Sequence, residues 1–145
     1  VSGEEQSIFD FKFFFFFKME MLDIDSEYAE RYLNKGFSGG EKKKNEILQM
    51  AVLEPKLAIL DETDSGLDVD AVKTVATGIQ KLASDENGIL IITHHNKILD
   101  YIDVDYVHVM VDGKIDKTGD MELARKIEKE GYKEIREKSE ECSYC

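Results

Sequence analysis

Residues 57–68 read LAILDETDSGLD, an apolar run that ends in two acids and continues into a polar, turn-forming stretch. A short apolar run between turn signals is typical of a strand buried in a parallel sheet. Ligands of such sheets bind just beyond the carboxyl ends of the strands. Asp61 and Glu62 are therefore expected at that edge, where paired carboxylates suit Mg²⁺ binding and water activation in phosphoryl transfer. Taken alone, the stretch is equally compatible with a strand that ends in a solvated acidic turn.

Two neighbouring stretches favour the phosphate-binding alternative. Upstream, Phe37-Ser38-Gly39-Gly40-Glu41 precedes a helical pattern, and the amides of such a loop at a helix N-terminus form a natural anion site. Downstream, the apolar run at 89–93 predicts a second buried strand, which ends at His94. On its own, His94 would read as a hydrogen-bonded histidine at a strand end.

These stretches, in this order, resemble the signature loop, Walker B strand, D-loop and switch histidine of the ABC ATPase family. The segments GFSGGEKKKNEILQMAVLEPKLAILDETDSGLDVDA and DYVHVMVDGKI, with TGD after it, are most similar to SufC, the ATPase of the SUF iron–sulfur cluster assembly system. The resemblance covers roughly residues 19–138. It implies an α/β fold, the C-terminal part of an ABC ATPase (P-loop NTPase) domain, with a mainly parallel sheet, flanking helices and a C-terminal β-hairpin.

The resemblance also implies roles for single residues. Asp61 is expected to hold Mg²⁺, Glu62 to polarise the attacking water, and His94 to contact the γ-phosphate and steady Glu62. The branch usually has an aromatic residue after this histidine, whereas here His95 follows it.

Nucleotide binding is expected from the loop and from the stretch that resembles the D-loop. The residues expected to bind ATP are Ser38, Gly39, Gly40, Glu41 and Asp68. In the family this loop reaches the nucleotide held by the opposite subunit of an ATP-dependent homodimer, and SufB-like and SufD-like scaffold proteins are the implied partners. The nucleotide-binding subunit of a membrane transporter and a nucleotide-free interaction module are the alternatives.

The sequence lacks a Walker A motif, which has the pattern GxxxxGK followed by Ser or Thr. Gly113-Lys114 is the only Gly-Lys pair, and Ile115 follows it. A truncated gene product or a damaged reading frame is therefore expected, inactive by itself. The expected division is a poorly defined segment at 1–18, a partial ATPase domain at 19–138 and a tail at 139–145.

Composition excludes some classes of function. The chain has 145 residues and a formal net charge of -12, which disfavours binding to a nucleic-acid backbone. Its longest aromatic run, Phe13 to Phe17, is too short to cross a bilayer. Two cysteines, Cys142 and Cys145, do not form a disulfide framework, so a cytoplasmic location is expected. Their CxxC spacing is at best half of a zinc site.

Hydrophobic periodicity predicts the remaining elements. Helices are expected within 19–34, at 41–53 and 69–83, in a short piece at 95–102, and from Asp120 to about Gly131. A strand at 106–111 and a return strand at 114–117 are expected around the hairpin signal Asp112-Gly113.

Overall fold

The computed structural model describes residues 7–32, 35–94 and 96–141, with the backbone alone for residue 96 and residues 132–141. His95, Cys142 and Cys145 lie outside the described residues. The chain divides into two compact units, Val1–Tyr101 and Ile102–Cys145, and each is described by itself.

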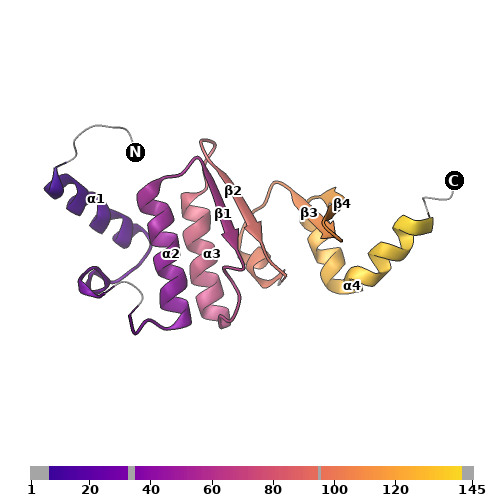
Figure 1. Ribbon diagram of the computed structural model, residues 1–145, viewed down its shortest axis with the longest axis horizontal. Helices are drawn as coiled ribbons and strands as arrows, with labels where there is room; N and C mark the ends of the chain where they lie inside the picture. Colours follow the sequence, from indigo (N-terminus) through magenta and orange to yellow (C-terminus); the bar gives the residue numbers. More distant parts are fainter. Residues whose placement is uncertain (1–6, 33–34, 95, 142–145) are drawn as a thin grey trace. The chain divides into compact units, whose positions relative to one another are not determined.

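The first unit contains the predicted strand–helix alternation. Two helices lie side by side next to a pair of parallel strands (Figure 1). Its elements in chain order are α1 (Ile8–Met21), the 3₁₀ helix η1 (Ser26–Glu30), α2 (Gly39–Leu53), β1 (Leu57–Asp61), α3 (Val69–Leu82), β2 (Gly88–Ile92) and the 3₁₀ helix η2 (Asn96–Tyr101).

Helices α2 and α3 run parallel and are closely packed. A Cβ atom added to Gly40 would lie 3.4 Å from the Cβ of Ala71, and one added to Gly78 would lie 3.0 Å from Cγ2 of Ile47. The second contact lies seven residues after the first on α2 and also seven residues after the first on α3. The N-termini of the two helices therefore lie at the same end. The apolar faces of both helices supply much of the core of this unit: Ile47, Leu48, Met50 and Ala51 from α2, and Val72, Val75, Ala76 and Ile79 from α3.

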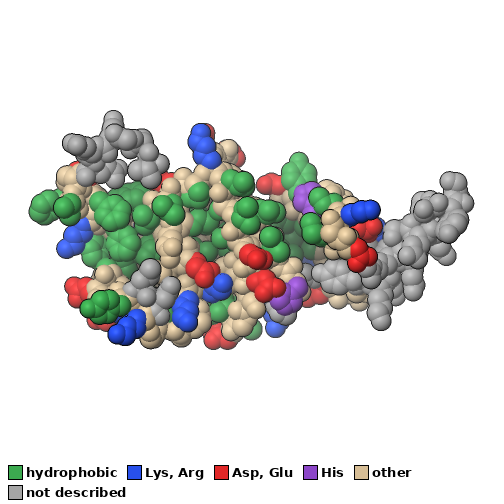
Figure 2. All heavy atoms as spheres, in the orientation of Figure 1, with side chains coloured by type: hydrophobic (Ala, Val, Ile, Leu, Met, Phe, Trp, Pro, Cys, Tyr) green, Lys and Arg blue, Asp and Glu red, His purple; other side chains and the backbone are tan. Residues whose placement is uncertain are grey.

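The strands β1 and β2 pair in parallel, with Ile59 opposite Leu90. On one face, Ala58 is buried. On the other, Leu57, Ile59, Leu90 and Ile92 are 63%, 60%, 46% and 48% exposed. Figure 2 shows hydrophobic side chains at the surface over these strands. The buried strands expected from the sequence are therefore covered on one face and exposed on the other within the described residues of this unit.

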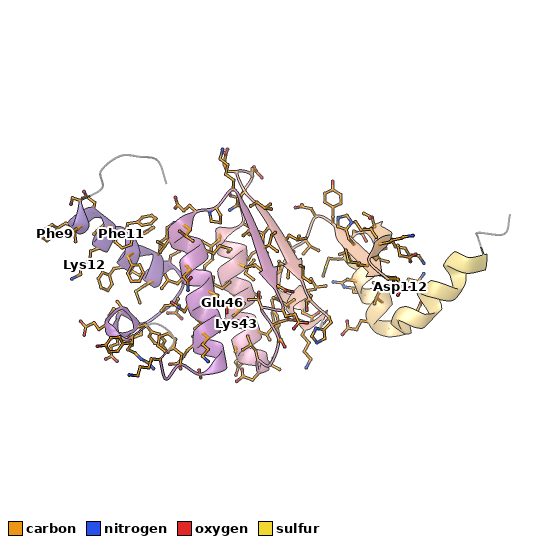
Figure 3. The ribbon with its side chains drawn as sticks, viewed as in Figure 1. Phe9, Phe11, Lys12, Lys43, Glu46 and Asp112 are labelled. Carbon is orange, nitrogen blue, oxygen red and sulfur yellow. The ribbon has the colours of Figure 1, made fainter. Side chains whose placement is uncertain are left out.

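The aromatic N-terminal stretch forms a helix that the sequence pattern did not predict. Helix α1 begins where the Ser7 side chain accepts hydrogen bonds from the amides of Phe9 and Asp10, at 3.2 and 3.3 Å. Phe9 and Phe11, labelled in Figure 3, remain 85% and 48% exposed. Apolar side chains occur all around the helix, so one packed face cannot bury them all.

The second unit is a hairpin packed against a helix. It contains β3 (Val107–Val111), β4 (Lys114–Gly119) and α4 (Met121–Glu141). Asp112 and Gly113 have φ values of 49° and 78°, as a tight turn of the predicted hairpin requires. Val109 and Ile127 form its buried core. Gly131, at φ 76° and ψ 167°, interrupts the helical backbone near the predicted end of this helix.

A capping box fixes the start of α2. The Ser38 hydroxyl accepts a hydrogen bond from the Glu41 amide at 3.3 Å, and Glu41 Oε2 accepts one from the Ser38 amide at 2.6 Å. Glu41 Oε1 also accepts hydrogen bonds from the Tyr28 hydroxyl at 2.6 Å and from Arg31 Nη1 at 3.1 Å. The Arg31 guanidinium lies 4.6 Å from the centre of the Phe37 ring, on the loop that leads into the helix.

These donors shift the acid–base equilibrium of Glu41. The hydrogen bond from Tyr28, followed by those from Ser38, lowers the pKa of Glu41 from 4.5 to about 2. The same contact with Glu41 raises the pKa of Tyr28 above 10.0. The Glu41 carboxylate therefore remains an acceptor for the Ser38 amide well into the acidic range.

We expect the purified chain to bind a hydrophobic dye strongly and to associate on concentration. The uncovered face of β1 and β2 and the exposed phenylalanines of α1 leave large apolar side chains in water, each of which would contribute about 1.5–3 kcal/mol if buried. Dye fluorescence and light scattering measure this. A monodisperse monomer with little dye binding and a sharp thermal transition would contradict the expectation.

The capping box should survive to low pH. Because the pKa of Glu41 is lowered on folding, its stabilising contribution is complete above pH 4.5 and is lost as the pH falls through about 2. Hydrogen exchange of the Ser38 amide should therefore show protection down to about pH 2, and Glu41→Gln should reduce that protection at pH 5. Glu46→Gln is the matched control, because it removes only the surface ion pair that Glu46 forms with Lys43 at 3.0 Å. Loss of protection between pH 5 and 4 in the unmodified chain would contradict the assignment.

Candidate functional site

The parallel pairing of β1 and β2 brings two predicted site segments to one edge of the sheet. Asp61 is the last residue of β1 and lies opposite Ile92, the last residue of β2. The Glu62 amide donates a hydrogen bond of 2.8 Å to the Ile92 carbonyl, which extends the pairing one residue past the strands. Since the two strands are parallel, Glu62 and His94 both lie just beyond the carboxyl ends of the strands, on the same side of the sheet's end.

Glu62 and His94 are in direct contact. Oε1 of Glu62 lies 3.1 Å from Nδ1 of His94, and both side chains are slightly more than half exposed. Figure 2 shows acidic and histidine side chains gathered near the ends of the two strands. The two residues therefore lie close together at the carboxyl ends of the strands.

The backbone of Glu62 is in an unusual conformation. Its φ of 48° is in the left-handed region, which costs a residue with a side chain about 1–3 kcal/mol. The surrounding hydrogen bonds hold it there: its amide bonds to Ile92, and its carbonyl accepts from the Ser65 amide at 3.1 Å. Such strain concentrates at functional sites, and here it occurs at the residue whose carboxylate contacts His94.

A partly buried hydrogen bond links the loops that follow the two strands. Thr93 donates a hydrogen bond of 2.8 Å from its hydroxyl to Oδ2 of Asp64, and Asp64 is only 5% exposed. Thr63, beside it, is 2% exposed. Sequence analysis did not predict this pair, because neither residue has a period or spacing that distinguishes it from an ordinary turn residue.

The turn that follows leads to the start of α3. Gly66 adopts a φ of 70°, which suits glycine. Asp68 then caps α3, its carboxylate accepting a hydrogen bond of 2.8 Å from the Ala71 amide. The carboxylate of this predicted nucleotide-binding residue therefore has a structural use in the described chain.

The signature-like loop lies beside this turn. A Cβ atom on Gly39 would lie 3.9 Å from Cδ2 of Leu67, so Ser38, Gly39 and Gly40 are next to the segment that carries Asp68. The capping box uses the amides of Ser38 and Glu41. The positive ends of the parallel dipoles of α2 and α3 reinforce one another here, which favours an anion.

The predicted residues therefore form two groups. Asp61, Glu62 and His94 lie at the sheet edge. Ser38 to Glu41 and Asp68 lie at the adjacent N-termini of α2 and α3. The segment from Glu62 to Asp68 joins the groups covalently, and the Asp64–Thr93 hydrogen bond fixes its start against β2.

The acidic side chains suit a metal ion held by a single carboxylate, not one held by a cluster of protein ligands. No cluster of three or more His, Cys, Asp or Glu side chains able to hold a metal ion occurs within residues 7–32, 35–94 and 96–141. Asp61 is exposed at the sheet edge and offers one carboxylate. That donor set suits Mg²⁺, which keeps several water ligands and needs only one or two carboxylates when substrate phosphates supply the others.

The basic triplet Lys42-Lys43-Lys44 follows the loop on α2. Lys43 pairs with Glu46 at 3.0 Å along the helix surface; both residues are labelled on α2 in Figure 3. No helix in the described part of the chain has the length and apolar character needed to span a membrane.

The chain is similar in sequence to several known proteins. No family model matches the chain. It is 57% identical over 119 residues to vegetative protein 296 of Bacillus subtilis, a match covering 82% of this chain and 46% of that protein. It is 58% identical over 115 residues to the "probable ATP-dependent transporter ycf16" of Guillardia theta, covering 79% and 46%. A "probable ABC transporter ATP-binding protein" of Streptococcus pyogenes is 57% identical over 115 residues, covering 79% and 45%.

Solved structures show the same fold. The ADP conformation of an ATP-binding cassette of an ABC transporter matches with a TM-score of 0.68 at 23% identity, over 87% of this chain and 49% of that one. A nucleotide-free cassette matches with a TM-score of 0.61. The chain spans about half the length of the relatives it matches. It is thus a homologue of ABC-type ATP-binding proteins, with the α/β fold of the corresponding part of an ATP-binding cassette.

Proposed function

We propose that this chain supplies the Walker B, signature, D-loop and switch-histidine part of a SufC-type ATPase in iron–sulfur cluster assembly. The observation that carries the proposal is the 3.1 Å contact between Glu62 and His94 at the end of a parallel sheet. A carboxylate oriented by an imidazole, next to a second carboxylate, is an arrangement that suits water activation in phosphoryl transfer.

Each residue at the sheet edge has a separate task in this proposal. Glu62 accepts hydrogen-bond donation from the attacking water and polarises it. His94 holds the Glu62 carboxylate in position and donates toward the γ-phosphate of ATP. Asp61 holds Mg²⁺, directly or through water; when bound, the ion neutralises charge on the phosphate oxygens.

The loop before α2 has a different task. Ser38, Gly39 and Gly40 present a hydroxyl and backbone amides to the phosphates of a nucleotide carried by the opposite subunit of an ATP-dependent homodimer. Glu41 acts through the capping box and fixes the backbone of Ser38. Asp68 holds the start of α3 beside this loop, in the segment that the family places on the dimer axis.

The assignment to the SUF branch rests on the similarity of two sequence segments. The segments GEKKKNEILQ and YVHVMVDGKI resemble SufC more than they resemble transporter subunits. SufB-like and SufD-like scaffolds are the proposed partners. A transporter subunit is the second candidate, favoured by the names of the relatives from Guillardia theta and Streptococcus pyogenes. Capture of the chain with a soluble scaffold or with a membrane protein distinguishes the two.

The isolated chain should hydrolyse ATP negligibly. The sequence contains no Walker A motif, and a P-loop with its lysine is what holds the β- and γ-phosphates. Phosphate release by the purified chain measures this. Robust turnover that disappears in Glu62→Gln would show that the sheet edge works without a P-loop and would overturn the expectation.

A fusion with the unmatched part of the Bacillus subtilis relative should restore turnover and allow the roles to be separated. In that fusion, Glu62→Gln should lower kcat by about 10²-fold or more while nucleotide stays bound, because Asp61 still holds Mg²⁺. His94→Ala should also reduce kcat, since Glu62 loses the ring nitrogen at 3.1 Å.

His95→Ala is the matched control for the switch histidine, and it should reduce kcat much less than His94→Ala. A larger loss with His95→Ala would show that the assignment of the switch histidine is wrong. Equal kcat values for the fusion and its Glu62→Gln variant would overturn the proposed role of Glu62.

A further inference from the structure

The loop that the proposed function assigns to nucleotide phosphates contains a carboxylate. Glu41 Oε2 accepts the hydrogen bond from the Ser38 amide at 2.6 Å. Hydrogen bonds from Tyr28 and Ser38 lower the pKa of Glu41 to about 2, so this carboxylate is charged at neutral pH. A negative charge next to the amides of Gly39 and Gly40 repels an anionic ligand of the loop, unless a cation offsets it.

Arg31 supplies a cation at this position. Its Nη1 donates a hydrogen bond to Glu41 Oε1 at 3.1 Å, and its Nη2 donates to the Gly36 carbonyl at 3.4 Å. The second distance is long for a hydrogen bond, so the charge-assisted contact with Glu41 is the stronger of the two. The guanidinium therefore contacts the Glu41 oxygen that the Ser38 amide does not use, and it brings the opposite charge to the loop.

Two aromatic rings restrict the position of Arg31. Its guanidinium lies 5.1 Å from the centre of the Tyr28 ring and 4.6 Å from the centre of the Phe37 ring. The two rings meet edge to face with their centres 5.5 Å apart, and Phe37 is buried. Exposed ion pairs usually contribute little, because both side chains lose freedom when they pair. Here the rings already hold the guanidinium, so less freedom is lost when it pairs with Glu41.

The spacing of Tyr28 and Arg31 in the sequence brings both side chains to Glu41. The Asp25 carboxylate accepts a hydrogen bond from the Glu27 amide at 2.9 Å at the start of η1, and the Arg31 amide donates to the Tyr28 carbonyl at 3.3 Å at its end. Side chains three residues apart lie on the same face of a 3₁₀ helix. The Tyr28 hydroxyl, at 2.6 Å, and the Arg31 guanidinium therefore reach the same oxygen, Oε1 of Glu41.

We propose that Arg31 is a positioning residue of this loop, whose guanidinium offsets the charge of the Glu41 carboxylate and so allows the loop amides to accept a phosphate. The inference rests on the proposed function, which assigns nucleotide phosphates to the loop. The alternative is a purely structural role, in which Arg31 only holds the loop backbone through Glu41 and Gly36. The two roles differ in one respect, because an offsetting charge is no longer needed once Glu41 is made neutral.

Binding of inorganic pyrophosphate to the full chain tests the inference, with the NMR shifts of the Gly39 and Gly40 amides as the readout. Arg31→Gln should raise the dissociation constant at least about fivefold, because it removes the offsetting charge. Arg31→Lys, which keeps the charge, should change it by less than about twofold. The double variant Arg31→Gln/Glu41→Gln should bind within about twofold of the unmodified chain, since the new amide at position 41 accepts hydrogen bonds but carries no charge.

Lys18→Gln is the matched control. Lys18 also forms an ion pair with a glutamate, Glu54, at 2.7 Å, but this pair lies at the C-terminal end of α2, whereas the loop lies at its N-terminus. The substitution removes one positive charge and one ion pair from the same unit, and it should leave the dissociation constant of pyrophosphate unchanged. Recovery of binding in the double variant excludes misfolding of Arg31→Gln as the cause of its weaker binding.

Three results with pyrophosphate would overturn the inference. The first is that the Gly39 and Gly40 amides do not respond to pyrophosphate, and the second is an unchanged dissociation constant for Arg31→Gln. The third is a double variant that binds as weakly as Arg31→Gln, which would assign Arg31 a purely structural role.

The fusion with the Bacillus subtilis sequence separates this inference from the proposed function. In the fusion, Arg31→Gln should raise KM for ATP at least about fivefold and leave kcat within about twofold, whereas Glu62→Gln lowers kcat. An active fusion whose KM is unchanged by Arg31→Gln would overturn the inference and leave the proposed function intact. A fusion without turnover, together with the expected pyrophosphate results, would overturn the proposed function and leave the role of Arg31 in the loop intact.

Discussion

The parallel pairing of β1 with β2 is the constraint on which the candidate site depends. Five residue pairs keep the strands in register, and the hydrogen bond from the Glu62 amide to the Ile92 carbonyl carries that register beyond the last pair. A shift of one residue would turn every side chain of a strand to the opposite face. Glu62 would then no longer meet His94, and Asp61 would leave the position at the sheet edge.

Local backbone conformation and hydrogen bonds further position the residues of the candidate site. Glu62, the first residue after β1, has a left-handed backbone, and the partly buried hydrogen bond between Asp64 and Thr93 links the following loop to the end of β2. At the helices, Ser38 and Asp68 each satisfy an amide that the first turn leaves free. Strain near the site is therefore balanced by hydrogen bonds within a few residues of it.

Much of this arrangement could be predicted from the sequence, because it depends on local signals. The apolar runs at 57–61 and 89–93, the Asp112-Gly113 turn and the helical period at 69–83 predicted β1, β2, the hairpin and α3 to within a residue or two. Ordered motifs of known spacing then predicted that Glu62 and His94 lie together. Such signals are strong because strand direction and turn chemistry leave few alternatives.

The remaining features depend on what surrounds a residue, which the sequence pattern does not contain. The apolar run of β1 predicted a strand that needs cover on both faces, yet the run alone does not show which face is covered. Helix α1 was not predicted, because a series of phenylalanines has neither a helical nor a strand period. Asp64 and Thr93 look like turn residues until their 2.8 Å hydrogen bond is seen.

The two close contacts between α2 and α3 have a mechanical consequence. Gly40 with Ala71 and Ile47 with Gly78 fasten the helices at two points separated by two turns, about 10 Å along the axis. Neither helix can rotate about one of these contacts without losing close packing at the other. Because Ser38 and Asp68 lie at the same end of this helix pair, a displacement of the loop at Ser38 is expected to move the turn at Asp68 with it.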